Sequence, residues 1–301
     1  MLLPEQRKPL LIFCDPGIDD ALALLWLLIE RFYYIRGIVA VADNTTADNA
    51  FLNLLKIICI SGSNHVPIYT SANISQNYHL LPNIHGNDSL GDLNLVSDNE
   101  YIEEGVIQSG ELNEAEIRCL SSDPSYNIIS LGPLTVVAYY LKKALYPPVE
   151  ITIMGGLLKE TGNYKGNEFN FGLDLIAAQD VLNYQDCLLK LVPLDLTRQF
   201  WLRQNFLETF KRPNKKVDYF RQFGEAYLDL TFKRGDAYAY PHDLTAAIAL
   251  TCPDLFRWRS GLIKIGGSTL RLSVGKKDLI AAEITVTQEK FEAIIKEWFR
   301  E

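Results

Sequence analysis

The sequence lacks an excess of basic residues and any long apolar run. Its formal net charge is −8, which argues against binding to nucleic acid or an anionic membrane surface, because both require clustered Lys and Arg. No run reaches the roughly 18 apolar residues of a membrane-spanning helix. Residues 1–13 carry a proline and charges where a secretory signal has apolar residues. We therefore expect a cytoplasmic protein with a neutral, cationic or small partner.

Paired-cysteine motifs and phosphate-binding loops are also missing. The five cysteines are odd in number and scattered, and none belongs to a CxxC motif, which argues against a disulfide framework or a zinc site. The absence of GxxxxGK[ST] makes a phosphoryl-transfer enzyme a weak alternative. The chain shows no internal repeat, linker or low-complexity segment. With 301 residues, 48% of them hydrophobic, it can bury a sizeable core, and we expect one domain spanning residues 1–301.

Short apolar runs alternate with helical patterns along most of the chain. The runs cover residues 9–14, 35–42, 66–71, 126–132, 149–156 and 187–195. This alternation predicts an open α/β fold with a mainly parallel sheet and helices on both faces. Residues 200–240 are more charged and helical, so we expect a helical insertion beside the carboxyl edge of the sheet. Gly224 and Gly235 would permit that segment to move as a lid.

Three carboxylates follow the first predicted strand in "DPGIDD", and parallel sheets bind ligands at this edge. Asp15 ends the strand, and Asp19 and Asp20 enter the first turn of the next helix. One interpretation is that they only cap the helix and complement its dipole. The other is that a cation lies among them, because carboxylates this close repel one another. Oxygen ligands of this kind suit Ca²⁺ or Mg²⁺.

Two further polar motifs lie downstream. His242 and Asp243 open a predicted helix, where Asp243 can serve as an ordinary N-cap and His242 as a surface or packing residue. The loop "GNYKGNEFN" carries Asn163, Glu168 and Asn170, which are also ordinary turn residues. A cluster of amides and carboxylates is nevertheless what several sugar hydroxyls require, because each hydroxyl both donates and accepts a hydrogen bond.

The motifs taken together resemble the inosine-uridine preferring nucleoside hydrolases, which are nucleoside N-ribohydrolases. The resemblance covers about residues 9–298 and rests on eight motifs in order. They are "DPGIDDALAL", "VADNTTADNAFLN", "IHGNDSLGD", "LGPLT", "ITIMGG", "GNYKGNEFN", "VPLDLT" and "HDLTAAIAL". The resemblance implies an open, mainly parallel Rossmann-like sheet. It also implies Ca²⁺-dependent hydrolysis of the N-glycosidic bond of a ribonucleoside, and a homodimer or homotetramer.

The resemblance further assigns roles to individual residues. Asp15, Asp20, Asp243 and the main-chain carbonyl of Leu131 would bind calcium, and Asp15 would also take a proton from the attacking water. His242 would lie near the leaving base, where a histidine can donate a proton near neutral pH. The remaining matches would contact the substrate, mainly its ribose. They are Asp19, Asn44, His85, Met154, Asn163, Glu168 and Asn170, together with Asp243.

This sequence departs from the family pattern at several positions. Phe13 replaces an acidic residue, Asp43 a glycine, Val136 an asparagine and Arg198 a histidine. These changes leave the expected metal ligands in place. They therefore affect the expected choice of substrate more than the expected reaction. Two alternatives remain open: a hydrolase narrowed to a modified nucleoside, and a non-catalytic calcium-dependent ribonucleoside-binding protein. The preferred base is undetermined, and aromatic residues such as Tyr227, Tyr238 and Tyr240 are candidates to stack on it.

Overall fold

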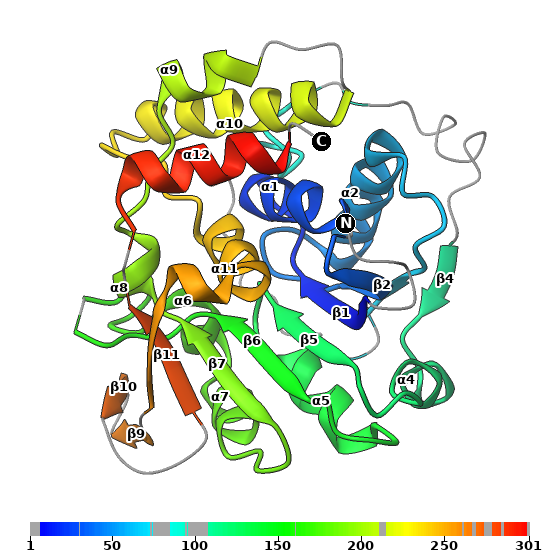
Figure 1. The fold of residues 1–301 in the computed structure, drawn as a ribbon. Coiled ribbons are helices and arrows are strands. Elements are labelled where there is room, and N and C mark those ends of the chain that lie inside the picture. Colours follow the sequence, from blue (N-terminus) through cyan, green and yellow to red (C-terminus); the bar gives the residue numbers. More distant parts are fainter. Residues whose placement is uncertain are drawn as a thin grey trace.

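A nine-stranded sheet forms the middle layer of the protein, and helices cover both of its faces (Figure 1). In this computed structural model the strand order is β4-β3-β2-β1-β5-β6-β7-β11-β8. Neighbouring strands pair in parallel, apart from β11 and β8, which are antiparallel. The predicted open, mainly parallel α/β sheet is confirmed. The structure describes residues 7–29, 31–72, 74, 85–93, 95, 108–159, 161–210, 215–260, 262–266, 269–273, 279–283 and 286–299.

The elements of the first half of the chain alternate between strands and helices. The strands are β1 (Lys8–Cys14), β2 (Tyr33–Ala40), β3 (Ile68–Thr70), β4 (Gln108–Glu111), β5 (Asn127–Ser130) and β6 (Glu150–Met154). The helices are α1 (Ile18–Leu27), α2 (Ala47–Ser61), α4 (Glu114–Leu120) and α5 (Thr135–Lys143). Caps set several boundaries: the Thr46 side chain accepts a hydrogen bond from the Asn49 amide at the start of α2, and Gly62 ends that helix in the left-handed conformation.

The second half is richer in helices. These are α6 (Phe169–Leu173), α7 (Leu175–Leu182), α8 (Leu194–Thr197), α9 (Gln204–Leu207), η2 (Glu208–Phe210), α10 (Lys215–Lys233), α11 (His242–Thr251), η3 (Pro253–Leu255) and α12 (Gln288–Trp298). The strands are β7 (Leu188–Val192), β8 (Arg257–Ser260), β9 (Leu262–Gly266), β10 (Thr269–Ser273) and β11 (Leu279–Glu283). β9 and β10 pair separately as a two-stranded antiparallel sheet.

The order of the strands reverses at β1. From there β2, β3 and β4 follow on one side, and β5, β6 and β7 on the other. In open parallel sheets such a reversal leaves a crevice at the carboxyl ends of the two central strands, and ligands bind there. Asp15 follows β1 directly, and Leu131 follows β5. The topology therefore brings the "DPGIDD" and "LGPLT" motifs together.

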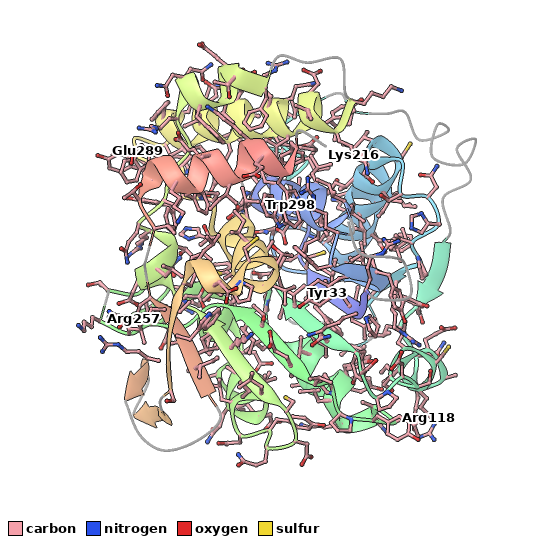
Figure 2. All side chains as sticks on the ribbon, viewed as in Figure 1. Tyr33, Arg118, Lys216, Arg257, Glu289 and Trp298 are labelled. Carbon is pink, nitrogen blue, oxygen red and sulfur yellow. The ribbon has the colours of Figure 1, made fainter. Side chains whose placement is uncertain are left out.

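Two hydrophobic layers hold the helices against the sheet. One contains α1, α2, α10, α11 and α12, and the other contains α4, α5 and α7 (Figure 1). In the first layer the ring of Trp298, labelled in Figure 2, stacks on Trp26 with centroids 4.0 Å apart, and its Nε1 donates to the Trp26 carbonyl at 3.1 Å. Burying two such rings together fixes α12 over α1.

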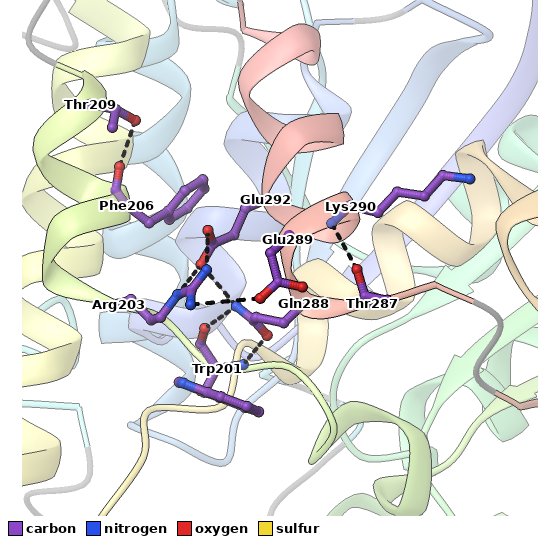
Figure 3. A network of polar contacts seen from close by, with 9 residues as sticks. All are labelled: Trp201, Arg203, Phe206, Thr209, Thr287, Gln288, Glu289, Lys290 and Glu292. Carbon is purple, nitrogen blue, oxygen red and sulfur yellow. Dashed lines mark hydrogen bonds and ion pairs between the residues drawn. The ribbon is translucent and has the colours of Figure 1, made fainter.

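A polar network joins α12 to the segment that follows α8 (Figure 3). Arg203 donates two hydrogen bonds to Glu292, from Nε at 2.6 Å and from Nη2 at 2.7 Å. The Gln288 side chain donates to the Trp201 carbonyl at 2.8 Å and accepts from the Trp201 amide at 3.2 Å. Bidentate contacts of this kind set orientation as well as distance. Residues 201–203 are thereby fixed to α12.

The two edge strands of the main sheet were not expected from the sequence. β4 and β8 are the outermost strands of the sheet, and their sequences, QSGE and RWRS, are polar. Edge strands often carry such residues, because one side of the strand remains unpaired. All five cysteines are free, as expected. In the part of the chain that the structure describes, no helix is both long and apolar enough to span a bilayer.

Candidate active site

The "DPGIDD" segment turns from β1 into α1 with its carboxylates buried. Asp15 is 4% exposed and Asp20 1% exposed. Asp20 Oδ2 accepts a hydrogen bond from the Gly17 amide at 2.9 Å, so this carboxylate does cap the helix. Its other oxygen, Oδ1, is buried and has no hydrogen-bond partner among the described residues. A buried oxygen of this kind needs a proton or a cation.

Glycines allow the motifs to approach closely. A Cβ atom on Gly132, in the "LGPLT" motif, would lie 2.3 Å from Asp15 Oδ1. A Cβ atom on Gly17 would lie 2.8 Å from Asn44 Nδ2 and 3.2 Å from the His85 ring. Asn44 Nδ2 also donates to the main-chain carbonyl of Asp15 at 2.8 Å. At both positions a side chain larger than that of glycine would collide with these neighbouring atoms, whatever the backbone angles.

The amino end of α11 meets the same segment. Asp19 Oδ2 accepts hydrogen bonds from the amides of His242 at 2.9 Å and Asp243 at 3.3 Å. Asp19 therefore supplies the cap that Asp243 was a candidate to supply itself, and the residue at the N-cap position is Pro241. The Asp243 carboxylate is left for another role. Asp19 Oδ1 is buried and has no hydrogen-bond partner among the described residues.

The polar loop before α6 forms a third side of the candidate site. Glu168 caps α6 and accepts hydrogen bonds from three amides, those of Gly156, Asn170 and Phe171, at 3.0–3.2 Å. Asn170 Nδ2 donates to the Leu131 carbonyl at 2.7 Å and to the Met154 carbonyl at 3.2 Å. These contacts tie the loop to the carboxyl ends of β5 and β6.

A cavity of about 900 Å³ lies between these motifs. All of the predicted site residues except Asp20 line it, and Asp20 is buried beside them. The lining members are Asp15, Asp19, Asn44, His85, Leu131, Met154, Asn163, Glu168, Asn170, His242 and Asp243. The structure thus brings the residues together as the resemblance implies, although their individual roles stay predictions.

Burial and mutual repulsion dominate the electrostatics of the carboxylates. Burial, followed by the charge of Asp20, raises the pKa of Asp15 and of Asp19 well above the usual value. For Asp243, burial is followed by the charge of Asp19. Burial alone raises the pKa of Asp20 to about 6 and is the main cause that raises that of Glu168 to about 7. Each of these groups would be stabilised in its charged form by a nearby cation.

The oxygen atoms of the site suit a hard cation that binds main-chain carbonyls and water in addition to side chains. Among the described residues, no three Asp, Glu, His or Cys side chains enclose a metal ion by themselves. Ca²⁺ takes roughly 6–8 oxygen ligands, which include main-chain carbonyls and water. The Leu131 carbonyl keeps a second lone pair beside its bond to Asn170. The unpartnered Oδ1 of Asp20 is the observation that favours a cation here.

Both histidines of the cavity are neutral at neutral pH. Burial, with Arg198 and His85 adding to it, lowers the pKa of His242 to about 3. Burial, with Arg234, lowers the pKa of His85 to about 4. His242 Nδ1 lies 2.6 Å from Thr197 Oγ1. A neutral His242 can donate a hydrogen bond to a leaving base but holds no extra proton to transfer, which weakens its predicted role as an acid.

Part of the cavity wall was not predicted from the sequence. Thr231 and Arg234 line the cavity from α10 and its continuation, beside the stacking candidate Tyr227. Their spacing of four and three residues is the helical signal that could have identified them as one stripe. Asp236 and Ala237 were also missed. Arg198, noted only as a departure from the family, lines the cavity as well. Among the candidate stacking aromatics, Tyr238 and Tyr240 join Tyr227 in the wall.

Comparison with known proteins agrees with this arrangement. A sequence model of inosine-uridine preferring nucleoside hydrolases matches residues 10–292. The pyrimidine-specific ribonucleoside hydrolase RihB of Escherichia coli is 31% identical over 206 residues, which are 65% of this chain and 62% of that relative. Uridine nucleosidase 1 of Arabidopsis thaliana is 26% identical over 269 residues, covering 86% of this chain and 79% of the relative.

The fold is also that of solved nucleoside hydrolases. The purine-preferring ribonucleoside hydrolase of Gardnerella vaginalis superposes with a TM-score of 0.80 at 21% identity, covering 97% of this chain and 96% of that one. The match to RihB spans less than two thirds of the length of that relative. The match to the family model covers residues 10–292, which include the motifs around the cavity. On this match the chain belongs to the inosine-uridine preferring nucleoside hydrolase family.

Proposed function

We propose that this protein hydrolyses the N-glycosidic bond of ribonucleosides to free base and ribose, and that it binds Ca²⁺ to do so. The observation that carries the proposal is the cavity at the carboxyl edge of the sheet. Buried carboxylates line it together with amide side chains suited to sugar hydroxyls. The names of the relatives point to pyrimidine, uridine and purine nucleosides in turn, so they leave the base open.

The protein's own residues would bind the ribose and activate water. Asp19, Asn44 and Asn170 would hold the 2′- and 3′-hydroxyl side, and Asn163 and Glu168 the 5′-hydroxyl. Cleavage of an N-glycosidic bond develops positive charge on the sugar, which buried carboxylates stabilise. Asp15 would accept the proton of the attacking water.

The metal site and the base would be served by other residues of the cavity. Asp15, Asp20, Asp243 and the Leu131 carbonyl would hold Ca²⁺, which lowers the pKa of a bound water when present. Asp243 would also reach a ribose hydroxyl, and Met154 would lie beneath the sugar. His242 would donate a hydrogen bond to the departing base, with His85 nearby. Cytoplasmic location and a homodimer or homotetramer stay predictions.

Product analysis tests the proposal. With Ca²⁺ present, a panel of purine, pyrimidine and modified ribonucleosides should yield free base and ribose in equal amounts from at least one member. The matching 2′-deoxyribonucleoside should react much more slowly, because the groups assigned to the 2′-hydroxyl would lose their partner. Tight binding of a ribonucleoside without any ribose release would instead support the non-catalytic alternative.

Replacing Gly132 by Ala should disable the site without removing any polar group. The new Cβ atom would lie 2.3 Å from Asp15 Oδ1 and 3.2 Å from the Asp15 amide, so the carboxylate must move. A displacement of about 1 Å at a catalytic group can lower the rate roughly 100-fold. Steady-state kcat/KM for ribose release measures the effect, and thermal unfolding checks the fold. A folded Gly132→Ala protein with unchanged kcat/KM would contradict the position given to Asp15.

A further inference from the structure

The imidazole ring of His242 is hydrogen-bonded at one of its two nitrogens. Its Nδ1 lies 2.6 Å from the hydroxyl of Thr197, which is a short hydrogen bond. No other described residue hydrogen-bonds to the ring, so Nε2 is the nitrogen that is left for a ligand. His242 lines the cavity and Thr197 does not. Thr197 can therefore act on a bound substrate only through this ring.

The hydrogen of the Thr197 hydroxyl has two acceptors within reach. Nδ1 of His242 lies at 2.6 Å, and the carbonyl of Leu194, three residues earlier in α8, lies at 3.4 Å. That carbonyl already accepts a hydrogen bond from the Arg198 amide at 3.1 Å. The hydroxyl therefore donates to Nδ1, which is nearer and has no other partner. In a neutral imidazole a nitrogen that accepts carries no hydrogen, so the ring hydrogen lies on Nε2.

The two residues are held in place from opposite sides of this bond. Thr197 is fully buried at the end of α8, and the Leu194 amide at the start of that helix donates to the Gly156 carbonyl at 3.0 Å. On the other side, the His242 amide donates to Asp19 Oδ2 at 2.9 Å. The direction of the His242 ring is thus set by two separate helices before a substrate binds.

The position of the ring hydrogen decides what His242 offers to a leaving base. The base gains negative charge as the N-glycosidic bond breaks, so a hydrogen-bond donor stabilises it and a lone pair repels it. We infer that Thr197 is a positioning residue, whose hydroxyl donates to His242 Nδ1 and keeps the ring hydrogen on Nε2, where it can be donated to the base. The inference rests on the proposed hydrolase function and adds the residue that orients its donor.

Removing the Thr197 hydroxyl should slow the reaction without weakening substrate binding. Thr197→Val keeps the branched shape of the side chain and loses only the hydrogen bond. We expect kcat for ribose release to fall roughly 10- to 100-fold, as the loss of a partner that orients a histidine does at other sites. KM should change little, because the donor acts on charge that develops in the transition state. Thr197→Ser keeps the hydroxyl and should retain most of the wild-type kcat.

Nitrogen NMR of the imidazole rings locates the ring hydrogen without any turnover. The chain has four histidines, so isotopically labelled histidine gives few signals, and His242→Gln identifies those of His242. At neutral pH we expect the wild-type ring to carry hydrogen on Nε2 and none on Nδ1. The Nδ1 signal should shift in Thr197→Val, because its hydrogen bond is lost, and should stay near the wild-type position in Thr197→Ser.

Thr152→Val is the matched control. Thr152 is another fully buried threonine, its hydroxyl donates to Glu150 Oε1 at 3.0 Å, and it lies outside the cavity wall. This variant should keep both the wild-type kcat and the Nδ1 signal of His242, and thermal unfolding checks that each variant is folded.

The outcomes separate this inference from the proposed function. Hydrogen on Nδ1 of His242 in the wild type, or an Nδ1 signal that Thr197→Val leaves unchanged, overturns the inference even if ribose is released. An unchanged kcat in folded Thr197→Val overturns it as well. If no ribonucleoside releases ribose, the proposed function fails, and the NMR spectra still decide whether Thr197 keeps the ring hydrogen on Nε2.

Discussion

Replacing Asp15 by Asn should lower kcat for ribose release roughly 10²- to 10⁴-fold while the protein stays folded. Asn keeps the size of the side chain and an oxygen ligand, but it cannot accept the proton of the attacking water, and general bases contribute about this factor. The side chain has little room to adjust, since it is 4% exposed and lies against Gly132. Kinetics at saturating Ca²⁺ and substrate isolate the chemical step from binding.

Two controls accompany this variant. Asp180 is a carboxylate on α7 that pairs with exposed Lys142, outside the cavity, so Asp180→Asn should keep wild-type kcat. Calorimetry should still detect Ca²⁺ binding to Asp15→Asn, with affinity reduced by the loss of one charge. A near-normal kcat in Asp15→Asn would show that another group accepts the proton.

Replacing Asp20 by Asn should abolish stabilisation of the protein by Ca²⁺. Asp20 Oδ2 accepts from the Gly17 amide, and Asn can keep that hydrogen bond. Its buried, unpartnered Oδ1 is the oxygen that a cation would use. A ligand at 100 times its Kd stabilises a folded protein by about 2.7 kcal/mol. Thermal unfolding should therefore show a Ca²⁺-dependent rise in Tm for the wild type and little or none for Asp20→Asn.

Without Ca²⁺ the same substitution should instead raise the stability of the folded protein. Burial raises the pKa of Asp20 from 3.8 to about 6. The calcium-free protein therefore loses stability as the pH rises from about 4 through 6, and the loss is complete at neutral pH. Asp20→Asn lacks this loss and should be more stable than the calcium-free wild type at pH 7, by roughly 1–3 kcal/mol. Equal Ca²⁺-dependent shifts of Tm in both proteins would show that Asp20 is not a ligand of the metal.

The centre of the fold could be predicted because its signals are local. β1 is a nearly continuous apolar run, and β5 and β6 carry isoleucines in short stretches that are almost entirely buried, as strands covered on both faces are. β4 and β8 could not, because a polar strand at the edge of a sheet is defined by its partner and not by its own sequence. Between β6 and β7 the chain forms two short helices, α6 and α7, because Glu168 caps the first and Asp174 the second.

The candidate site could be predicted from the sequence to a similar extent. Parallel strands end at one edge, so the polar residues after β1, β5 and β6 had to gather there. Two contacts were not readable from the sequence. Asp19 caps α11 across 223 positions of sequence, and α10 turns its Tyr227 and Thr231 face toward the cavity. Both depend on how distant helices pack, which local patterns do not encode.

The most direct measurement is ribose release from a ribonucleoside substrate before and after removal of Ca²⁺. The protein is treated with a calcium-selective chelator, freed of it, and assayed with and without added Ca²⁺, alongside Asp15→Asn. We predict that chelation abolishes ribose release, that Ca²⁺ restores it in the wild type, and that Asp15→Asn with Ca²⁺ stays at least about 100-fold slower than the wild type. Undiminished ribose release after chelation would contradict a cation bound among the buried carboxylates.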